Sequence, residues 1–208
     1  MLRFLLISSC VVLSLTACSL KTTEGLRQLE STKAVVVNPY FSNPEIDYVY
    51  KAKIEAYGRN FGGILIIKKM EENHHRIVMT TELGNKLLDL QFKNGVFTKN
   101  FVVEELDRKM ILKVLKADFR LLLMEKSLVL NAYDSETQRV YQTQKHNRYN
   151  FYFVSKESDM LEQIRNTSKV KEKVVVDFYS ETGKEADSIF IKHKNIKLHI
   201  DLKKFKDE

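Results

Sequence analysis

The stretch KAKIEAYGRNFGGILIIKK, residues 51–69, contains two alternating runs of residues with a turn signal between them. The first run continues an alternation that begins at Asp47, with apolar residues on one side and charged residues on the other, which is typical of a strand with one wet face. A turn is expected at 58–60 and a second strand at 61–68, where Gly62–Gly63 predicts a bulge or a sharp curl. The stretch therefore predicts an antiparallel hairpin that must bury one face.

The same pattern extends along most of the chain. A third strand is predicted in HRIVMTTE and a fourth in KLLDLQF, and the Asn94–Gly95 pair is a strong hairpin signal before a fifth. Strand patterns return after residue 138. They are RVYQTQ (139–144), YNFYFV (149–154), EKVVVDFYS (172–180) and the closing hairpin DSIFIKHKNIKLHIDLKKF (187–205).

Between these two groups of strands the period changes. Over residues 107–124 the apolar residues recur three and four positions apart, as in an amphipathic helix, and Asp107 lies near the expected start, where a carboxylate is favoured. A helix of about 18 residues is about 27 Å long. The predicted fold is mainly β with α: a curled antiparallel sheet, or half-open barrel, with one helix packed in its concave face.

The apolar strand residues are the candidates for lining this concave face. Alternating Ile, Leu and Val is found in any half-buried sheet, and a ligand cavity would use the same residue types, so composition leaves open whether the hollow is filled. The candidates are Ile54, Leu65, Ile67, Met79, Leu88, Leu90, Ile191, Leu198 and Ile200.

The N-terminus predicts export. One positive charge at Arg3 precedes an apolar run that is too short for a membrane-spanning helix and reads as a signal peptide over residues 1–17. Its end, Leu-Thr-Ala-Cys, resembles the lipobox of bacterial lipoproteins, which implies cleavage before Cys18 and acylation of that cysteine, as by palmitate. Several acyl chains make such an anchor effectively permanent. An ordinary signal peptide that happens to contain a cysteine is the alternative.

The remaining organisation follows from this anchor. Of the two cysteines, Cys10 leaves with the signal and Cys18 carries lipid, so no thiol is left for a disulfide or a metal. Residues 18–46 contain both prolines and no sustained periodicity, and they are expected to form the lipidated N-terminus and a tether. The folded domain is expected over 47–208.

Several functions find no support in the sequence. The formal charge of +7 comes from scattered lysines without an aromatic-interleaved basic module, so nucleic-acid binding is not expected. No G-x-S-x-G, H-E-x-x-H, glycine-rich phosphate loop or C-x-x-C occurs, so no enzyme is predicted. His74 and His75 face opposite sides of a strand, and His193 and His199 lack an evident third ligand, so no metal site and no cofactor is expected.

Four stretches of sequence carry a resemblance to a known family. The hairpin 51–69, the hairpin RIVMTTELGNKLLDLQFKNG with its Leu-Gly tip, and the helix DRKMILKVLKADFRLLL are similar to the corresponding elements of LolB, the outer-membrane receptor for lipoproteins, and more loosely of its periplasmic partner LolA. The closing SIFIKHKNIKLHIDL is similar to the family's last hairpin. The absence of tryptophan and the lysine-rich C-terminal end depart from the family's usual pattern.

This resemblance implies a function. The family's curled sheet covers an apolar cavity that accepts the acyl chains of lipoproteins, which a LolA-like periplasmic carrier delivers. Leu83 matches the family's protruding leucine, which helps insert the delivered lipoprotein into the membrane. Ser19 is not the aspartate that commonly signals inner-membrane retention, so the expected location is the outer membrane, facing the periplasm. For Leu83 the alternative is that its side chain folds back onto the sheet edge.

Two other functions remain open at this point. The first is a structural or interaction lipoprotein of the envelope, whose sheet encloses a filled core and whose outer surface docks a protein partner. The second is a lipid-directed hydrolase. An open apolar hollow favours acyl-chain binding, a filled one favours the interaction protein, and convergent His, Ser and acidic groups around a pocket favour the hydrolase.

Overall fold

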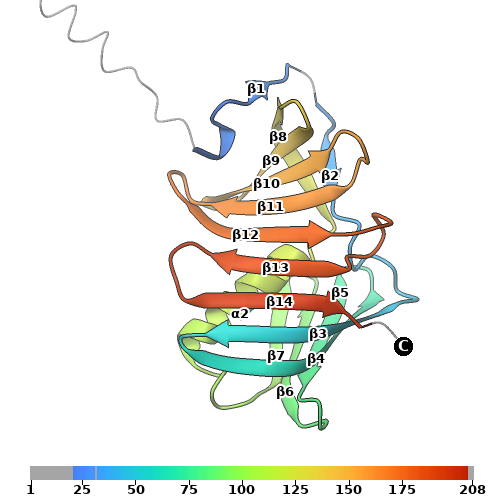
Figure 1. The fold of residues 1–208 in the computed structure, drawn as a ribbon, viewed down its shortest axis with the longest axis vertical. Coiled ribbons are helices and arrows are strands. Elements are labelled where there is room, and N and C mark those ends of the chain that lie inside the picture. Colours follow the sequence, from blue (N-terminus) through green and yellow to red (C-terminus); the bar gives the residue numbers. More distant parts are fainter. Residues whose placement is uncertain (1–20, 31, 206–208) are drawn as a thin grey trace, which may run out of the picture.

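The strands of the computed structural model form one antiparallel sheet (Figure 1). The structure describes residues 21–30 and 32–205. Its fourteen strands in that part of the chain are β1 (Arg27–Gln28), β2 (Val35–Val37), β3 (Asp47–Ala56), β4 (Arg59–Glu71), β5 (His74–Thr80), β6 (Lys86–Lys93), β7 (Val96–Val102), β8 (Lys126–Asp134), β9 (Gln138–Lys145), β10 (Arg148–Ser155), β11 (Leu161–Thr167), β12 (Glu172–Tyr179), β13 (Ser188–His193) and β14 (Leu198–Lys204). A 3-10 helix, η2 (Lys21–Thr23), and one α-helix, α2 (Lys109–Leu122), complete the described elements.

The strand order shows how the two halves of the chain meet. The sheet runs β1-β8-β9-β10-β11-β12-β13-β14-β3-β4-β5-β6-β7, and β2 also pairs with β8. The last strand, β14, therefore lies in the middle of the sheet, where it pairs with β13 on one side and with β3 on the other. Because the two ends of the order do not pair with each other, the sheet is curled but not closed. This confirms the predicted half-open architecture.

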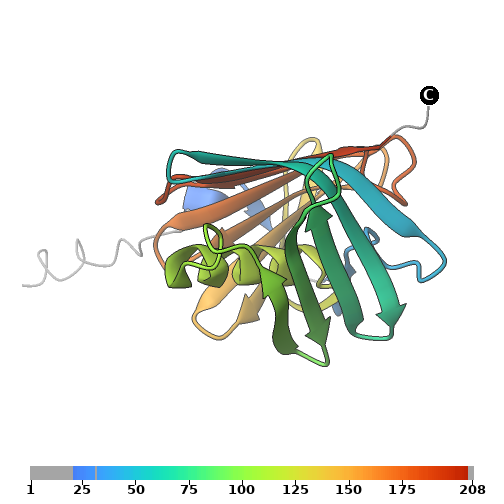
Figure 2. The ribbon, with the colours of Figure 1, turned by 90° about the horizontal axis from the view of Figure 1, so that it is seen from below.

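Helix α2 lies on the concave side of the curled sheet (Figure 2). Its buried side chains include Ile111, Leu115, Phe119 and Leu122, which belong to the same apolar core as the strands. The predicted helix is confirmed with slightly shorter ends. Asp107 precedes the helix and binds Lys99 with an Nζ–Oδ2 distance of 2.6 Å, and it is not part of the first turn. Of the helices in the described part of the chain, none combines the length and the apolar character that a bilayer crossing requires.

Of the two alternatives predicted at Gly62–Gly63, a bulge or a sharp curl, the bulge is not present between β3 and β4. The two strands pair in regular register there, Ala52 opposite Gly63. Position 63 requires glycine for a different reason: a Cβ atom there would lie 1.8 Å from the backbone oxygen of Thr80 on β5. Only a residue without a side chain allows β4 and β5 to approach so closely where the sheet curls.

The predicted tether is wrong for the described part of 18–46. Val36 in β2, Tyr40 and Phe41 are at most 1% exposed and belong to the central core. Tyr40 stacks on Phe178 with ring centroids 4.8 Å apart, and its hydroxyl donates to the Leu161 carbonyl at 2.8 Å. The two prolines suggested a linker. The apolar side chains between them are buried instead, because their burial is favourable and an exposed spacer would leave them in water. The domain therefore begins well before residue 47.

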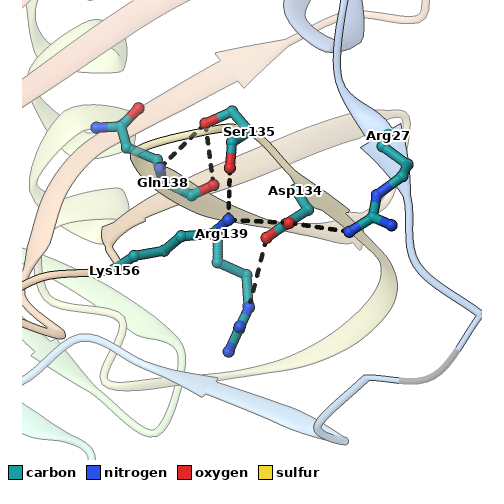
Figure 3. Close-up of polar contacts among 6 residues, drawn as sticks. All are labelled: Arg27, Asp134, Ser135, Gln138, Arg139 and Lys156. Atoms are coloured by element: carbon teal, nitrogen blue, oxygen red, sulfur yellow. Dashed lines mark hydrogen bonds and ion pairs between the residues drawn. The ribbon is translucent and has the colours of Figure 1, made fainter.

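The short strand β1 is also attached to the sheet (Figure 3). The Asp134 carboxylate at the end of β8 accepts from Arg27 at 3.2 Å and from Lys156 at 2.9 Å, and Arg139 lies 3.9 Å away. The hydrogen bond from the Lys156 ammonium is the main reason why the pKa of Asp134 is lowered. These contacts attach the chain just after η2 to the tip of the β8–β9 hairpin, whose turn Ser135 closes through its hydrogen bonds with Gln138.

Candidate functional site

The nine side chains predicted to line the concave face are gathered in one apolar cluster by β3, β4, β5, β6, β13 and β14. Each is at most 2% exposed, and most are fully buried. A side chain with no exposed surface has no water-sized space beside it, so these residues pack against neighbours in this conformation. The structure thus brings the predicted residues together as core. Their role in binding acyl chains remains a prediction.

Helix α2 supplies the other side of this core. One face, with Leu115 and Phe119 fully buried, packs against the strands, whereas Lys113 on the opposite face is exposed. This is the division expected of an amphipathic surface helix. Arg120 donates to the Gly95 carbonyl of the β6–β7 turn at 3.0 Å, so the helix also contacts the sheet's far end. The helix, together with the N-terminal segment that contains Val36, Tyr40 and Phe41, therefore separates the concave face from solvent.

A buried polar pair connects α2 to the sheet. His193 at the end of β13 places Nε2 2.9 Å from Oδ2 of Asp118, and the two side chains are 5% and 1% exposed. Burial raises the pKa of the Asp118 carboxyl, and the contact with His193 lowers it in part. Sequence reasoning considered His193 only as a metal ligand without an evident third partner, and it did not single out Asp118. The sequence did contain a signal for this pair: Asp118 is a charged residue on the apolar face of the predicted helix.

Polar contacts also fix the C-terminal end of α2. The Asn38 side-chain amide donates to the Leu122 carbonyl at 2.9 Å, and Lys69 on β4 lies 2.8 Å from the Glu125 carboxylate just after the helix. His75 on β5 is buried and hydrogen-bonds the Phe41 carbonyl at 3.0 Å. Burial lowers the pKa of His75. These contacts join the N-terminal segment, the sheet and the helix end at one place.

A small opening lies beside this end of the helix. A pocket of ≈ 220 Å³ is lined by His75, Phe92, Leu123, Met124 and Glu125 among others. Phe92 and Leu123 belong to the central core, whereas Glu125 is polar. The pocket therefore connects the surface with the edge of the apolar cluster between the β4–β5 hairpin and α2.

Leu83 lies at the tip of the β5–β6 loop and is 91% exposed. The loop is closed by hydrogen bonds from the Thr81 amide to the Asn85 carbonyl and from the Gly84 amide to the Thr81 carbonyl, 2.8 and 2.9 Å long. Gly84 has a φ of 86°, a conformation that glycine adopts at little cost. The side chain does not fold back onto the sheet edge. Its role at a membrane remains a prediction.

The remaining candidates are placed as follows. Cys18 lies outside the described residues. His193 binds Asp118, and His199 on β14 lies opposite Lys192 in the strand register, so the two histidines of the last hairpin have different neighbours. In the described ranges no group of three or more His, Cys, Asp or Glu residues is arranged to hold a metal ion.

Comparison with known proteins bears on the fold. A scan against protein-family models finds no match, and a search of curated proteins finds no significant match. Among solved structures, the chain is similar to the crystal structure of a LolA superfamily protein from Nitrosomonas europaea, with a TM-score of 0.50 and 7% sequence identity, covering 82% of this chain and 91% of that chain. At such low identity the likeness concerns the fold alone. The chain therefore has a fold like that of this LolA superfamily protein, and the likeness does not test whether it is LolB-like.

Proposed function

We propose that this protein is an outer-membrane lipoprotein, anchored through Cys18, that binds acyl chains and helps receive or insert lipoproteins. The observation that carries the proposal is the apolar concave face covered by a single amphipathic helix. A LolA-like carrier is the proposed donor. The similarity of the fold to a LolA superfamily protein supports this class of function, and the exposed Leu83 supports a role at the membrane.

In this proposal α2 acts as a movable cover. Acyl chains enter where the apolar side chains of the helix now pack, and each CH₂ group removed from water contributes about 0.8 kcal/mol. The polar contacts at Asp118 and Asn38 hold the helix closed without ligand. An advantage of about 1.4 kcal/mol over the carrier already biases transfer tenfold, so small differences in lining suffice.

The test is a transfer and insertion assay. The lipidated chain receives a labelled lipoprotein from a loaded cognate carrier, and the label is then followed into vesicles. We expect transfer by the wild type and by Leu83→Glu, with insertion reduced only in the variant. Leu128→Glu is the matched control, since Leu128 on β8 is a second exposed leucine, at 78%. A folded chain that takes up no label contradicts the proposal.

The interaction lipoprotein with a filled core is the second candidate. It is favoured by the burial of the nine concave side chains, which leaves no water-sized space beside most of them. Its surface would then dock a protein partner, and the acyl chains would serve only as the anchor. The absence of transfer in the assay above, from a sample that unfolds cooperatively, would favour this candidate.

A further inference from the structure

Over the strands from β8 to β4, the two ends of the sheet differ in charge. Neighbouring antiparallel strands place alternate hairpins at the same end, so the turns 57–60, 145–148, 168–171 and 194–197 share one end of the sheet. The Tyr57 amide donates to the Lys197 carbonyl at 2.8 Å and the Lys194 amide to the Lys173 carbonyl at 2.9 Å, which ties three of these turns side by side. In Figure 1 the β11–β12, β13–β14 and β3–β4 turns lie along the left edge.

These four turns are basic without exception. Together they contain seven Lys or Arg residues and no Asp or Glu, and all seven are exposed. No ion pair within the described part of the chain neutralises any of them. They are Arg59, Lys145, Arg148, Lys169, Lys171, Lys194 and Lys197. Val170, at 65% exposure, and Tyr57, at 43%, stand among them as exposed apolar side chains.

The connections at the opposite end have the reverse charge. The segments 135–137, 156–160 and 180–187 contain six Asp or Glu residues and two lysines, Lys156 and Lys184. Lys156 is already bound to Asp134. The part of the sheet from β8 to β4 is thus polarised along its strands, with a positive end and a negative end, and such a charge distribution orients a protein on a charged surface.

The start of the described chain lies at the positive end. The Thr22 hydroxyl in η2 donates to the carboxylate of Glu172 at 3.0 Å, and Glu172 directly follows the 168–171 turn. Cys18 lies four positions before Thr22 in the sequence, which allows a reach of at most about 14 Å. An anchor at Cys18 therefore brings the basic turns close to the bilayer.

We propose that these basic turns dock on the anionic headgroups of the membrane that holds the protein, with the acidic end pointing away. Each lysine or arginine near an anionic surface is attracted to it within about a Debye length. Val170 and Tyr57 would lie at the headgroup level between these charges. This inference rests on the membrane localisation proposed above, and it does not depend on acyl-chain binding.

The test uses the absence of tryptophan from the chain. A single tryptophan is introduced at the basic end by Val170→Trp or at the acidic end by Thr182→Trp, and the full-length chain is reconstituted in vesicles with a dansyl-labelled headgroup. Whether acyl chains or the apolar N-terminal residues hold the chain, energy transfer reports which end faces the bilayer. We expect more transfer from position 170 than from position 182 in vesicles containing phosphatidylglycerol.

The charges are tested separately. The double substitution Lys169→Glu with Lys171→Glu should reduce the transfer from a tryptophan at position 170, whereas Lys184→Glu, the same kind of change at the acidic end, should not. The preference should also weaken in about 1 M salt, where the Debye length is about 3 Å. Equal transfer from both ends in anionic vesicles, or a preference that neither salt nor the lysine substitutions alter, overturns the proposal. An acidic protein partner for this end would then be sought.

Discussion

Gly63 is the glycine whose replacement conflicts most directly with the backbone of the sheet. Replacement by alanine puts a Cβ atom against the Thr80 carbonyl of the neighbouring strand. The contacted atoms belong to the backbone, which cannot rotate away as a flexible side chain can. We expect Gly63→Ala to lower the free energy of unfolding by about 3 kcal/mol, as overpacking does. Gly62→Ala is the matched control, because nothing lies within 4 Å of its Cβ position. Denaturant unfolding measures both, and equal stability of the two variants would contradict this explanation.

Asp118 is predicted to make stability depend on pH. Burial raises its pKa in the folded protein above the ordinary value of 3.8, so the folded state binds the proton more tightly than the unfolded state. Its contribution is therefore favourable at low pH and is lost as the pH rises from about 4 through the raised pKa. Asp118→Asn keeps an oxygen that accepts from His193 and carries no charge.

The measurement is the free energy of unfolding of wild type and Asp118→Asn at several pH values. The wild type should lose stability relative to the variant as the pH rises through this window, and the difference should be constant below about pH 3. A difference that is independent of pH, or that changes in the other direction, would show that burial does not control this carboxyl.

Residue-scale prediction from sequence succeeded where side-chain period decided the outcome. The concave residues, such as Ile54 and Leu90, were assigned to the correct face because alternation fixes which side of a strand is buried. The Asp118–His193 pair was not predicted. It joins residues 75 positions apart, and no local pattern indicates which helix residue will meet which strand.

At the scale of elements, α2 should depend on its buried face. Leu115 is fully buried, so Leu115→Ala is expected to cost about 2–5 kcal/mol in unfolding free energy. Lys113→Ala, on the exposed face of the same helix, should change it by about 0.5 kcal/mol or less. Thermal or denaturant unfolding measures both variants. Similar losses from both would mean that the helix is held by its propensity and not by packing.

Strand patterns varied in how clearly they could be read. The helix and the strands with one regular apolar face, such as β3 and β14, have strong periods, and these were predicted. β8 and β11 were missed: β8 shows exposed Leu128 and Leu130 on one side, and β11 carries polar residues at most positions. In each case the neighbouring strands, and not the segment's own pattern, complete the hydrogen bonding that makes it a strand.

At the scale of the whole molecule, the N-terminal segment is part of the fold. A chain that begins at Asp47 lacks Val36, Tyr40 and Phe41, all buried in the central core. Fully burying one such side chain contributes about 1.5–3 kcal/mol, a large share of the 5–15 kcal/mol of a typical domain. We expect this chain to lose cooperative unfolding by circular dichroism, whereas a chain that begins at Ser19 keeps it. Cooperative unfolding of both would restore the tether interpretation.

The central position of β14 also sets the order in which the molecule can be made. A chain that emerges N-terminus first delivers β3 early, but the partner of β3 on that side, residues 198–204, comes last. Until then the sheet exists as two separate parts, each with a bare edge at the future junction, and such edges are open to wrong pairing with other chains. Completion of the sheet must therefore wait for residues 198–204, and a chain cut short before Leu198 is exposed to aggregation at both edges.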